Sequence, residues 1–136
     1  MAVTANSIIT PQTPKSAVVN VAAANSTYTT TPTNSQLLVT AGASGARLTK
    51  LQAVPCATVG TANQLQLFRS SDAGATKLFA DSALMATYTM AQITEAPTTD
   101  FGYSDDNPMI LQPNERLYVA EGQAVSVNFI AEWADY

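Results

Sequence analysis

The sequence predicts an all-β fold, a sandwich or a barrel of about eight short antiparallel strands. The first observation behind this prediction is that short alternating or apolar segments are separated by Gly, Pro and Asn turns, roughly every ten residues. The second is that only 12% of the residues are charged, while Thr, Ser, Asn and Gln stand where an exposed helix would carry Lys and Glu. This composition favours strands and turns over helices.

The N-terminal part of the chain is expected to be extended. Residues 1–15 predict an arm, because Pro11 and Pro14 exclude a regular helix and remove backbone donors. Residues 15–24 predict a first strand. Alternate apolar side chains of that strand would share one face, namely Val19, Val21 and Ala23. The Thr-rich residues 25–35 then predict an extended or edge segment that ends in a turn.

The middle of the chain predicts strands that are bounded by turns. These strands are expected at residues 36–40, 46–54, 63–69, 76–80, 108–111 and 116–120. The sequence of residues 63–69, NQLQLFR, alternates cleanly. Its two Leu residues would lie on one face, and Gln64 and Gln66 on the other, which is typical of a half-buried strand.

Two segments toward the C-terminus differ in how clearly they predict a structure. Residues 81–92 fit either a loop or a short helix at Ala83–Ala86, followed by a strand. The last strand has the clearest alternation, so it is expected to be central or paired on both edges. Its inward face would consist of Val125, Val127, Phe129, Ala131 and Trp133, with Trp133 in the core.

The residue types needed for catalysis or metal binding are scarce. There is no His, which is the commonest general base and metal ligand. The one Cys, Cys56, excludes a disulfide within the chain and is expected to be a buried core residue. The acidic residues Asp100, Asp105, Asp106 and Glu115 do not have EF-hand spacing and predict a solvated acidic loop. We therefore expect no catalytic site, no metal, no cofactor and no enzymatic activity.

Charge is distributed unevenly along the chain. Residues 1–77 hold five basic and one acidic side chain, a balance of +4, and residues 78–136 hold one basic and nine acidic, a balance of −8. This asymmetry predicts either head-to-tail contacts between copies or charges that interleave within one fold. The basic residues are scattered, so no nucleic-acid partner is expected. No signal peptide or membrane span is predicted, which implies synthesis in the cytoplasm.

The low charge content predicts that much of the surface is covered by other proteins. A soluble domain usually has about 25% charged residues, and charge keeps a free monomer soluble. The chain is therefore expected to be a subunit of an assembly. Candidate contacts with other subunits or a larger shell are Lys15, Val19, Tyr28, Thr30 and Pro32. If the protein instead binds glycans, Tyr103 and Tyr118 are the candidate stacking residues.

Three segments together resemble a known group of proteins. They are QLLVTAGASGARLTKLQAV, NQLQLFRSSDAGATKLFADSALMA and NPMILQPNERLYVAEGQAVSVNFIAEWADY, and they span Gln36 to Tyr136. Their order resembles small virion structural proteins of tailed bacteriophages. The resemblance implies a β-sandwich of jelly-roll type, assembled in many copies on the particle. It divides the chain into residues 1–35, an arm and first strand that could dock on a partner, and residues 36–136, the sandwich domain.

Low charge, the arm and the resemblance lead to one main functional expectation. The chain is expected to be a capsid decoration or cement protein, present as a homo-oligomer, a trimer, on the surface of the virion and in contact with the major capsid protein. Two alternatives stay open at this point. One is a tail, collar or fibre-associated virion protein, and the other is a carbohydrate-binding module that acts at the host surface.

Overall fold

The computed structural model describes residues 10–136. This range contains nine strands and no helix, and therefore none long and apolar enough to cross a membrane. The strands are β1 (Thr13–Val21), β2 (Gln36–Thr40), β3 (Ala46–Pro55), β4 (Asn63–Ser70), β5 (Leu78–Met85), β6 (Thr99–Asp100), β7 (Met109–Leu111), β8 (Arg116–Glu121) and β9 (Val127–Asp135).

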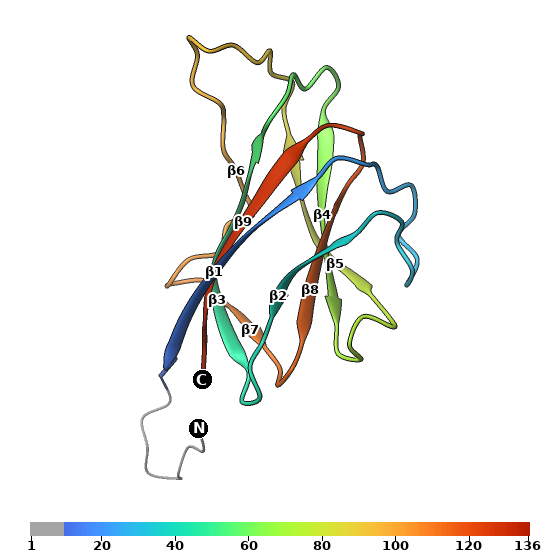
Figure 1. Ribbon diagram of the computed structural model, residues 1–136. Coiled ribbons are helices and arrows are strands. Elements are labelled where there is room, and N and C mark those ends of the chain that lie inside the picture. Colours follow the sequence, from blue (N-terminus) through green and yellow to red (C-terminus); the bar gives the residue numbers. More distant parts are fainter. Residues whose placement is uncertain (1–9) are drawn as a thin grey trace.

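The strands form two antiparallel sheets that pack face to face (Figure 1). One sheet has the order β1-β9-β3-β6, with β7 also paired to β3, and the other has the order β2-β8-β4-β5. Consecutive strands mostly lie in different sheets, so the chain crosses repeatedly between the two layers. The predicted all-β antiparallel sandwich is confirmed.

The core lies between the two sheets and follows the period of two that each strand shows in sequence. Burial alternates along β9 and along most of β3, so that one face of each strand is buried and the other is half-exposed. The large side chains that fill the core are fully buried: Leu48, Leu51, Leu65, Leu67, Met85, Leu117 and Phe129. Burying a side chain of this size stabilises a fold by about 1.5–3 kcal/mol.

The C-terminal strand is central, as the sequence predicts. On one edge β9 pairs with β1 over nine residues, and on the other it pairs with β3. Trp133 is 8% exposed, which confirms its place in the core. Val125 lies just before the strand and is half-buried against the same core.

The first strand is an integral part of the sandwich. β1 pairs with β9 from Thr13 to Val21, and Val19 and Val21 point to the core as expected. Ala23 lies beyond the end of the strand. Residues 1–9 of the expected arm lie outside the described residues, so its docking role stays a prediction.

Residues 25–35 form no strand and instead cross the outer face of the four-stranded sheet. The Asn25 N–H donates to the carbonyl of Glu121 at the end of β8, and the Thr30 carbonyl accepts from Lys77 N–H next to β5. Of the two expectations for these residues, the edge strand is wrong, whereas an extended segment that ends in a turn is confirmed. Pro32 and the threonines favour an extended chain, which meets the neighbouring strands through these two backbone bonds and is otherwise held by side chains such as that of Asn25.

Two other local expectations are corrected by the structure. Ala83 to Met85 belong to β5, which runs without a break through the residues expected to form a helical turn. Pairing with β4 overrides the helix propensity of this Ala- and Leu-containing stretch. Cys56 is exposed rather than buried, because β3 ends at the inward-facing Pro55 and the next side chain faces solvent.

The basic side chains of the first half and the acidic side chains of the second half interleave within the fold, as one of the two expectations has it. Four ion pairs each join a basic residue of the first 77 to an acidic residue of the remainder: Lys15–Asp135, Arg47–Asp105, Lys50–Glu132 and Arg69–Glu115. The fifth basic residue of that half, Lys77, lies over the ring of Tyr118, 4.5 Å from its centroid. The charge asymmetry is thus used inside one copy.

Candidate functional site

An apolar row crosses the outer face of the four-stranded sheet. Cross-strand pairing aligns Leu37 of β2 with Tyr118 of β8, Tyr118 with Phe68 of β4, and Phe68 with Phe79 of β5. Phe68 is fully buried and Tyr118 is 9% exposed, whereas Leu37 and Phe79 at the two edges are 41% and 40% exposed. The row gives this outer face a second, smaller core of its own.

Tyr28 packs against Phe79 at the end of this row and extends the row into an exposed apolar surface. Its ring centroid is 4.9 Å from that of Phe79, which is in turn 5.5 Å from that of Phe68. Leu84, 68% exposed, pairs with Gln64 on the same face, and the Tyr28 hydroxyl donates to the Gln64 side-chain carbonyl. We call the exposed side chains Tyr28, Phe79 and Leu84 the Tyr28 face.

A network of amides holds the Tyr28 face from beneath. Asn25 is 4% exposed, and its Nδ2 donates to Gln66 Oε1 and to Thr27 O, both at 2.7 Å. Asn25 Oδ1 accepts from Thr27 N and from the N–H and hydroxyl of Thr33. Gln66 Nε2 donates to Gln64 Oε1, which ties the network to Tyr28. One buried Asn therefore fixes both ends of the segment that presents Tyr28.

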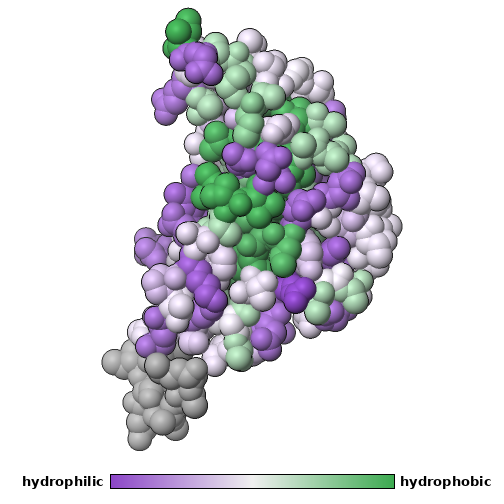
Figure 2. All heavy atoms as spheres, in the orientation of Figure 1, coloured by the Kyte–Doolittle hydropathy of each residue, from purple (hydrophilic) through white to green (hydrophobic). Residues whose placement is uncertain are grey.

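A second apolar surface lies where the edge strands β1 and β2 meet. Figure 2 shows apolar side chains gathered in the middle of the face on which β1 and β2 lie in front, with polar side chains around them. β1 contributes Val18, 63% exposed on the outer side of the strand, and the half-buried Ala17 and Val19 on its inner side, and β2 contributes Leu37. We call these four side chains the β1–β2 seam. Each of these strands pairs on one side only.

The five predicted contact residues divide between these surfaces and the interior. Tyr28 and Thr30 are exposed on the outer segment, and Val19 is half-buried in the β1–β2 seam, where its neighbour Val18 is the exposed residue. Pro32 is buried, because the chain turns there back toward β2, so its role as a contact is wrong. Lys15 is half-exposed, and its ammonium lies 2.6 Å from the Asp135 carboxylate.

The two tyrosines expected to stack on a glycan are not exposed platforms. Tyr118 is buried under Lys77 and against Gly74, where a Cβ would come within 2.2 Å of the tyrosine oxygen. That role is therefore wrong for Tyr118. Tyr103 is half-buried and donates its hydroxyl to Asp81 at 2.6 Å. Burial and this bond raise the pKa of Tyr103 well above its usual value.

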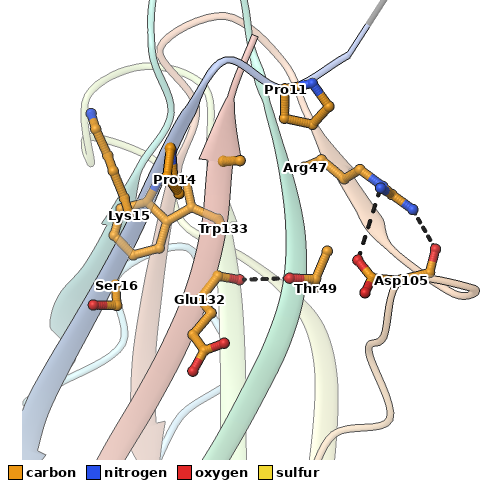
Figure 3. A pocket seen from close by; sticks show the side chains of 10 residues that line it. Pro11, Pro14, Lys15, Ser16, Arg47, Thr49, Asp105, Glu132 and Trp133 are labelled. Atoms are coloured by element: carbon orange, nitrogen blue, oxygen red, sulfur yellow. Dashed lines mark hydrogen bonds and ion pairs between the residues drawn. The ribbon is translucent and has the colours of Figure 1, made fainter.

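A shallow groove of about 500 Å³ lies on the outer face of the five-stranded sheet (Figure 3). Arg47 and Asp105 form one wall through an ion pair at 4.0 Å and a bond from the guanidinium to the Asp105 carbonyl. Glu132 lies across from them, and its carbonyl accepts from the Thr49 hydroxyl at 3.4 Å. The charges in the groove are already paired, and none is placed to activate a nucleophile.

The acidic residues are dispersed rather than gathered at one point. Between residues 10 and 136, no three Asp, Glu or Cys side chains lie close enough together to hold a metal ion. Glu115 lies apart from the loop and is 4% exposed, and its two carboxylate oxygens accept from Nε and Nη2 of Arg69. The pairing with Glu115 raises the pKa of Arg69.

One acidic side chain is buried without a cation. Glu121 at the end of β8 is 0% exposed and points into the sandwich. Its Oε2 accepts from Asn63 Nδ2 at 2.9 Å, and its Oε1 has no hydrogen-bond partner among the described residues. Burial raises the pKa of Glu121 to about 7, against the opposing effect of the Asn63 amide and the Val125 N–H.

Sequence reasoning found Tyr28 but missed the residues around it. Phe79 and Leu84 lie in β5, whose outer face is visible only once its pairing with β4 is known. The alternation in sequence predicts Gln64 and Gln66 on one polar, solvent-facing side of the strand, but Gln66 is 2% exposed because residues 25–33 cover it. The signal available in sequence was the Thr-rich, charge-free segment that follows β1.

Comparison with known proteins places the fold. No family model matches the sequence, and no curated protein matches it. Among solved structures, the chain is similar to Eiger, a TNF from S. frugiperda, with a TM-score of 0.52 and 10% identity over 92% of this chain and 93% of that chain. At this identity the likeness shows the fold alone, and it identifies the sandwich as a jelly roll.

Proposed function

We propose that this chain is a non-enzymatic structural protein of a tailed-phage virion, a decoration or cement subunit on the outside of the capsid. The observation that carries the proposal is the pair of apolar surfaces on a chain with only 12% charged residues. Single exposed apolar residues are ordinary, but contiguous ones indicate a contact. The resemblance of residues 36–136 to small phage virion proteins supplies the context, and the jelly-roll fold is compatible with it.

The two surfaces suit different partners. The β1–β2 seam is aliphatic and lies on strand edges. Permanent interfaces between copies of a chain are more hydrophobic than transient interfaces, and strand edges can pair with another chain, so the seam suits a permanent contact between copies. The Tyr28 face has two aromatic rings beside amide groups, the composition typical of an interface that forms between separately folded partners. We therefore propose that copies associate through the seam, as a trimer, and dock on the major capsid protein through the Tyr28 face.

Many weak contacts would act together on one shell. A trimer would present three copies of the Tyr28 face, so each contact could be modest while the oligomer is held firmly. In this arrangement the protein would stabilise the assembled shell without any chemical step. Ion pairs within each copy use four of the six basic side chains, which fits a contact made through apolar and amide groups.

The proposal is tested by adding the purified protein to assembled shells that lack it and counting the bound copies per capsid subunit. Saturation at a number comparable to the capsid subunits is expected, with at least a tenfold loss of affinity for Leu84→Asp. Ile93→Asp is the matched control, because Ile93 is 95% exposed but lies outside both surfaces. A few copies per particle would support a tail, collar or fibre position instead. No binding to shells would refute the proposal.

A carbohydrate-binding role has one specific observation in its favour. Tyr28 and Phe79 place exposed rings beside the Gln64 amide, and sugars bind to such a combination of ring faces and hydrogen-bonding groups. Binding to a glycan array that is lost with Tyr28→Ala and kept with Ile93→Ala would favour this role over decoration.

A further inference from the structure

The Glu121 end of the sandwich contains no basic side chain. The six basic residues lie toward the opposite end of the strands, namely Lys15, Arg47, Lys50, Arg69, Lys77 and Arg116. The chain segments around Glu121 are residues 22–46, 51–68, 83–94 and 122–131, and they carry no charge at all. The ionisable side chains among them are Cys56, which is exposed, and Tyr28 and Tyr88, whose hydroxyls are hydrogen bonded. A charged Glu121 would therefore have no counter-charge.

Glu121 also holds the polar groups of the neighbouring loop in place. Its Oε2 fixes the Asn63 side chain, whose Oδ1 accepts from Gly122 N at 3.1 Å and from Gln123 N at 3.0 Å. These bonds close the turn that follows β8. A buried carboxylate with one unpartnered oxygen and no cation beside it costs much more than a neutral carboxylic acid in the same place.

The backbone of the same residue anchors the segment that presents the Tyr28 face. The Glu121 carbonyl accepts from Asn25 N at 2.7 Å. Asn25 then connects to Gln66, and Gln66 connects through Gln64 to the Tyr28 hydroxyl. A continuous set of hydrogen bonds thus joins the end of β8 to the Tyr28 face.

We propose that Glu121 is a proton-dependent latch for this segment. With its proton, Glu121 stays buried, and residues 25–33 remain closed over the four-stranded sheet. Without its proton, the carboxylate is stabilised by hydration, which requires the end of β8 and the attached segment to open. Opening separates Asn25 from Glu121 and disorders the Tyr28 face. The effect on shell binding rests on the proposed function, but the latch itself does not.

The direction of the pH dependence follows from where the proton is bound. Glu121 has its ordinary pKa of 4.5 when opened to water and about 7 when closed. Between these two values the closed form holds more protons than the open form, so opening becomes about tenfold easier for each pH unit. Above pH 7 Glu121 is ionised in both forms, so the equilibrium constant for opening no longer changes with pH.

The latch is tested by amide hydrogen exchange of the full chain at pH 5, 6, 7 and 8, with Glu121→Gln and Glu132→Gln beside the wild type. Protection of residues 25–33 should fall at least tenfold between pH 5 and 7 in the wild type and in Glu132→Gln, whose changed carboxylate is exposed. In Glu121→Gln the protection of residues 25–33 should be the same at all four pH values, after correction for the intrinsic exchange rate. Equal profiles in the wild type and Glu121→Gln would overturn the latch, as would an equal loss in β3 and β9.

Two further measurements keep the proposal falsifiable. If Glu121→Gln does not fold, carbon NMR of the Glu121 carboxyl in the wild type should titrate near pH 7, and a midpoint below 5 would overturn the latch. Shell binding should be weaker at pH 7.5 than at pH 5.5 in the wild type and equal at both in Glu121→Gln. If no shell binding occurs at any pH while exchange follows the expected profile, the proposed function fails and the latch stands.

Discussion

The two glutamates at the ends of β8 are both buried, but their surroundings differ completely. Glu115 is bound by the Arg69 guanidinium and also accepts from Gln112 N, so its charge is compensated in place. Glu121 has the Asn63 amide on one oxygen, and among the described residues no cation lies beside it and the other oxygen has no hydrogen-bond partner. A buried charge is tolerated where a cation is fixed beside it, and is avoided by protonation where none exists.

The same difference separates the two ends of the sandwich. The end that contains Glu115 has all six basic residues and four ion pairs, and its side chains are fixed by charge. The end that contains Glu121 is held by amides and by apolar packing. It is also the end from which residues 25–33 leave the core to present Tyr28. The end that contains Glu121, which has no basic side chain, is therefore the end to which the proposed latch belongs.

The largest effect is expected from Glu115→Gln, which leaves the Arg69 guanidinium without its carboxylate. Breaking a buried ion pair costs about 3–5 kcal/mol, and since the Arg69 side chain is 33% exposed, we expect a loss of about 2–3 kcal/mol in the free energy of unfolding. Urea unfolding at pH 7 measures it. A loss no greater than that of Glu132→Gln would show that the pair is not a buried one in solution.

A smaller loss is expected from Asn25→Ala. This change removes the side chain that bonds to Gln66 and to both ends of the Tyr28 segment, and it leaves the Gln66 carbonyl buried and unpaired. Unpaired buried amide groups cost about 1–3 kcal/mol, so we expect unfolding to become easier by about 2 kcal/mol. The Tyr28 ring should also lose its near-ultraviolet circular dichroism. Asn107→Ala, which removes an exposed amide that bonds to the Gly102 carbonyl in another loop, is the control. A native spectrum for Asn25→Ala would contradict the network.

Glu121→Gln is expected to stabilise the fold, in contrast to the two preceding substitutions. The neutral amide keeps the shape of the side chain and removes the penalty for ionisation, so the variant should be more stable than the wild type at pH 7–8 by about 1–2 kcal/mol. The wild type should lose stability as pH rises from 4.5 to 7, and the variant should not. Urea unfolding at these two pH values measures both. A variant that is destabilised at pH 8 would show that Glu121 is ionised and satisfied in the folded chain.

The smallest effect on stability is expected from Tyr28→Ser. Tyr28 is 57% exposed and one side of its ring already faces water, so the loss should be about 1 kcal/mol or less. Thermal unfolding measures this loss. Removal of the ring should nevertheless weaken shell binding strongly, since exposed aromatic residues dominate such contacts. Val18→Ser in the β1–β2 seam should instead lower the mass of the oligomer, measured by light scattering, at an equally small cost in stability. A change in the same property for both variants would show that the two surfaces are not separate.

The sequence predicted the parts of the fold that depend on local periodicity. The alternation from Val127 to Trp133 identified a central strand, and the alternating residues 63–69 identified β4. It did not predict that Gln66 is buried, because the residues that cover it come from a segment about 40 positions earlier in the chain. Nor could it place Glu121, since the missing cation is a property of which strands meet at that end. The burial of Pro32 and Tyr118 could not be predicted for the same reason, since it depends on contacts with segments that are distant in the sequence.

The most direct test of the account is side-chain footprinting of the protein on assembled shells compared with the free protein. Oxidative labelling modifies exposed aromatic and aliphatic side chains, and the two surfaces and Ile93 all carry such residues. We predict that Tyr28, Phe79 and Leu84 become protected on the shell, that Val18 is already protected in the free oligomer, and that Ile93 stays reactive in both states. Unchanged labelling of the Tyr28 face on shells that retain the protein would contradict the account.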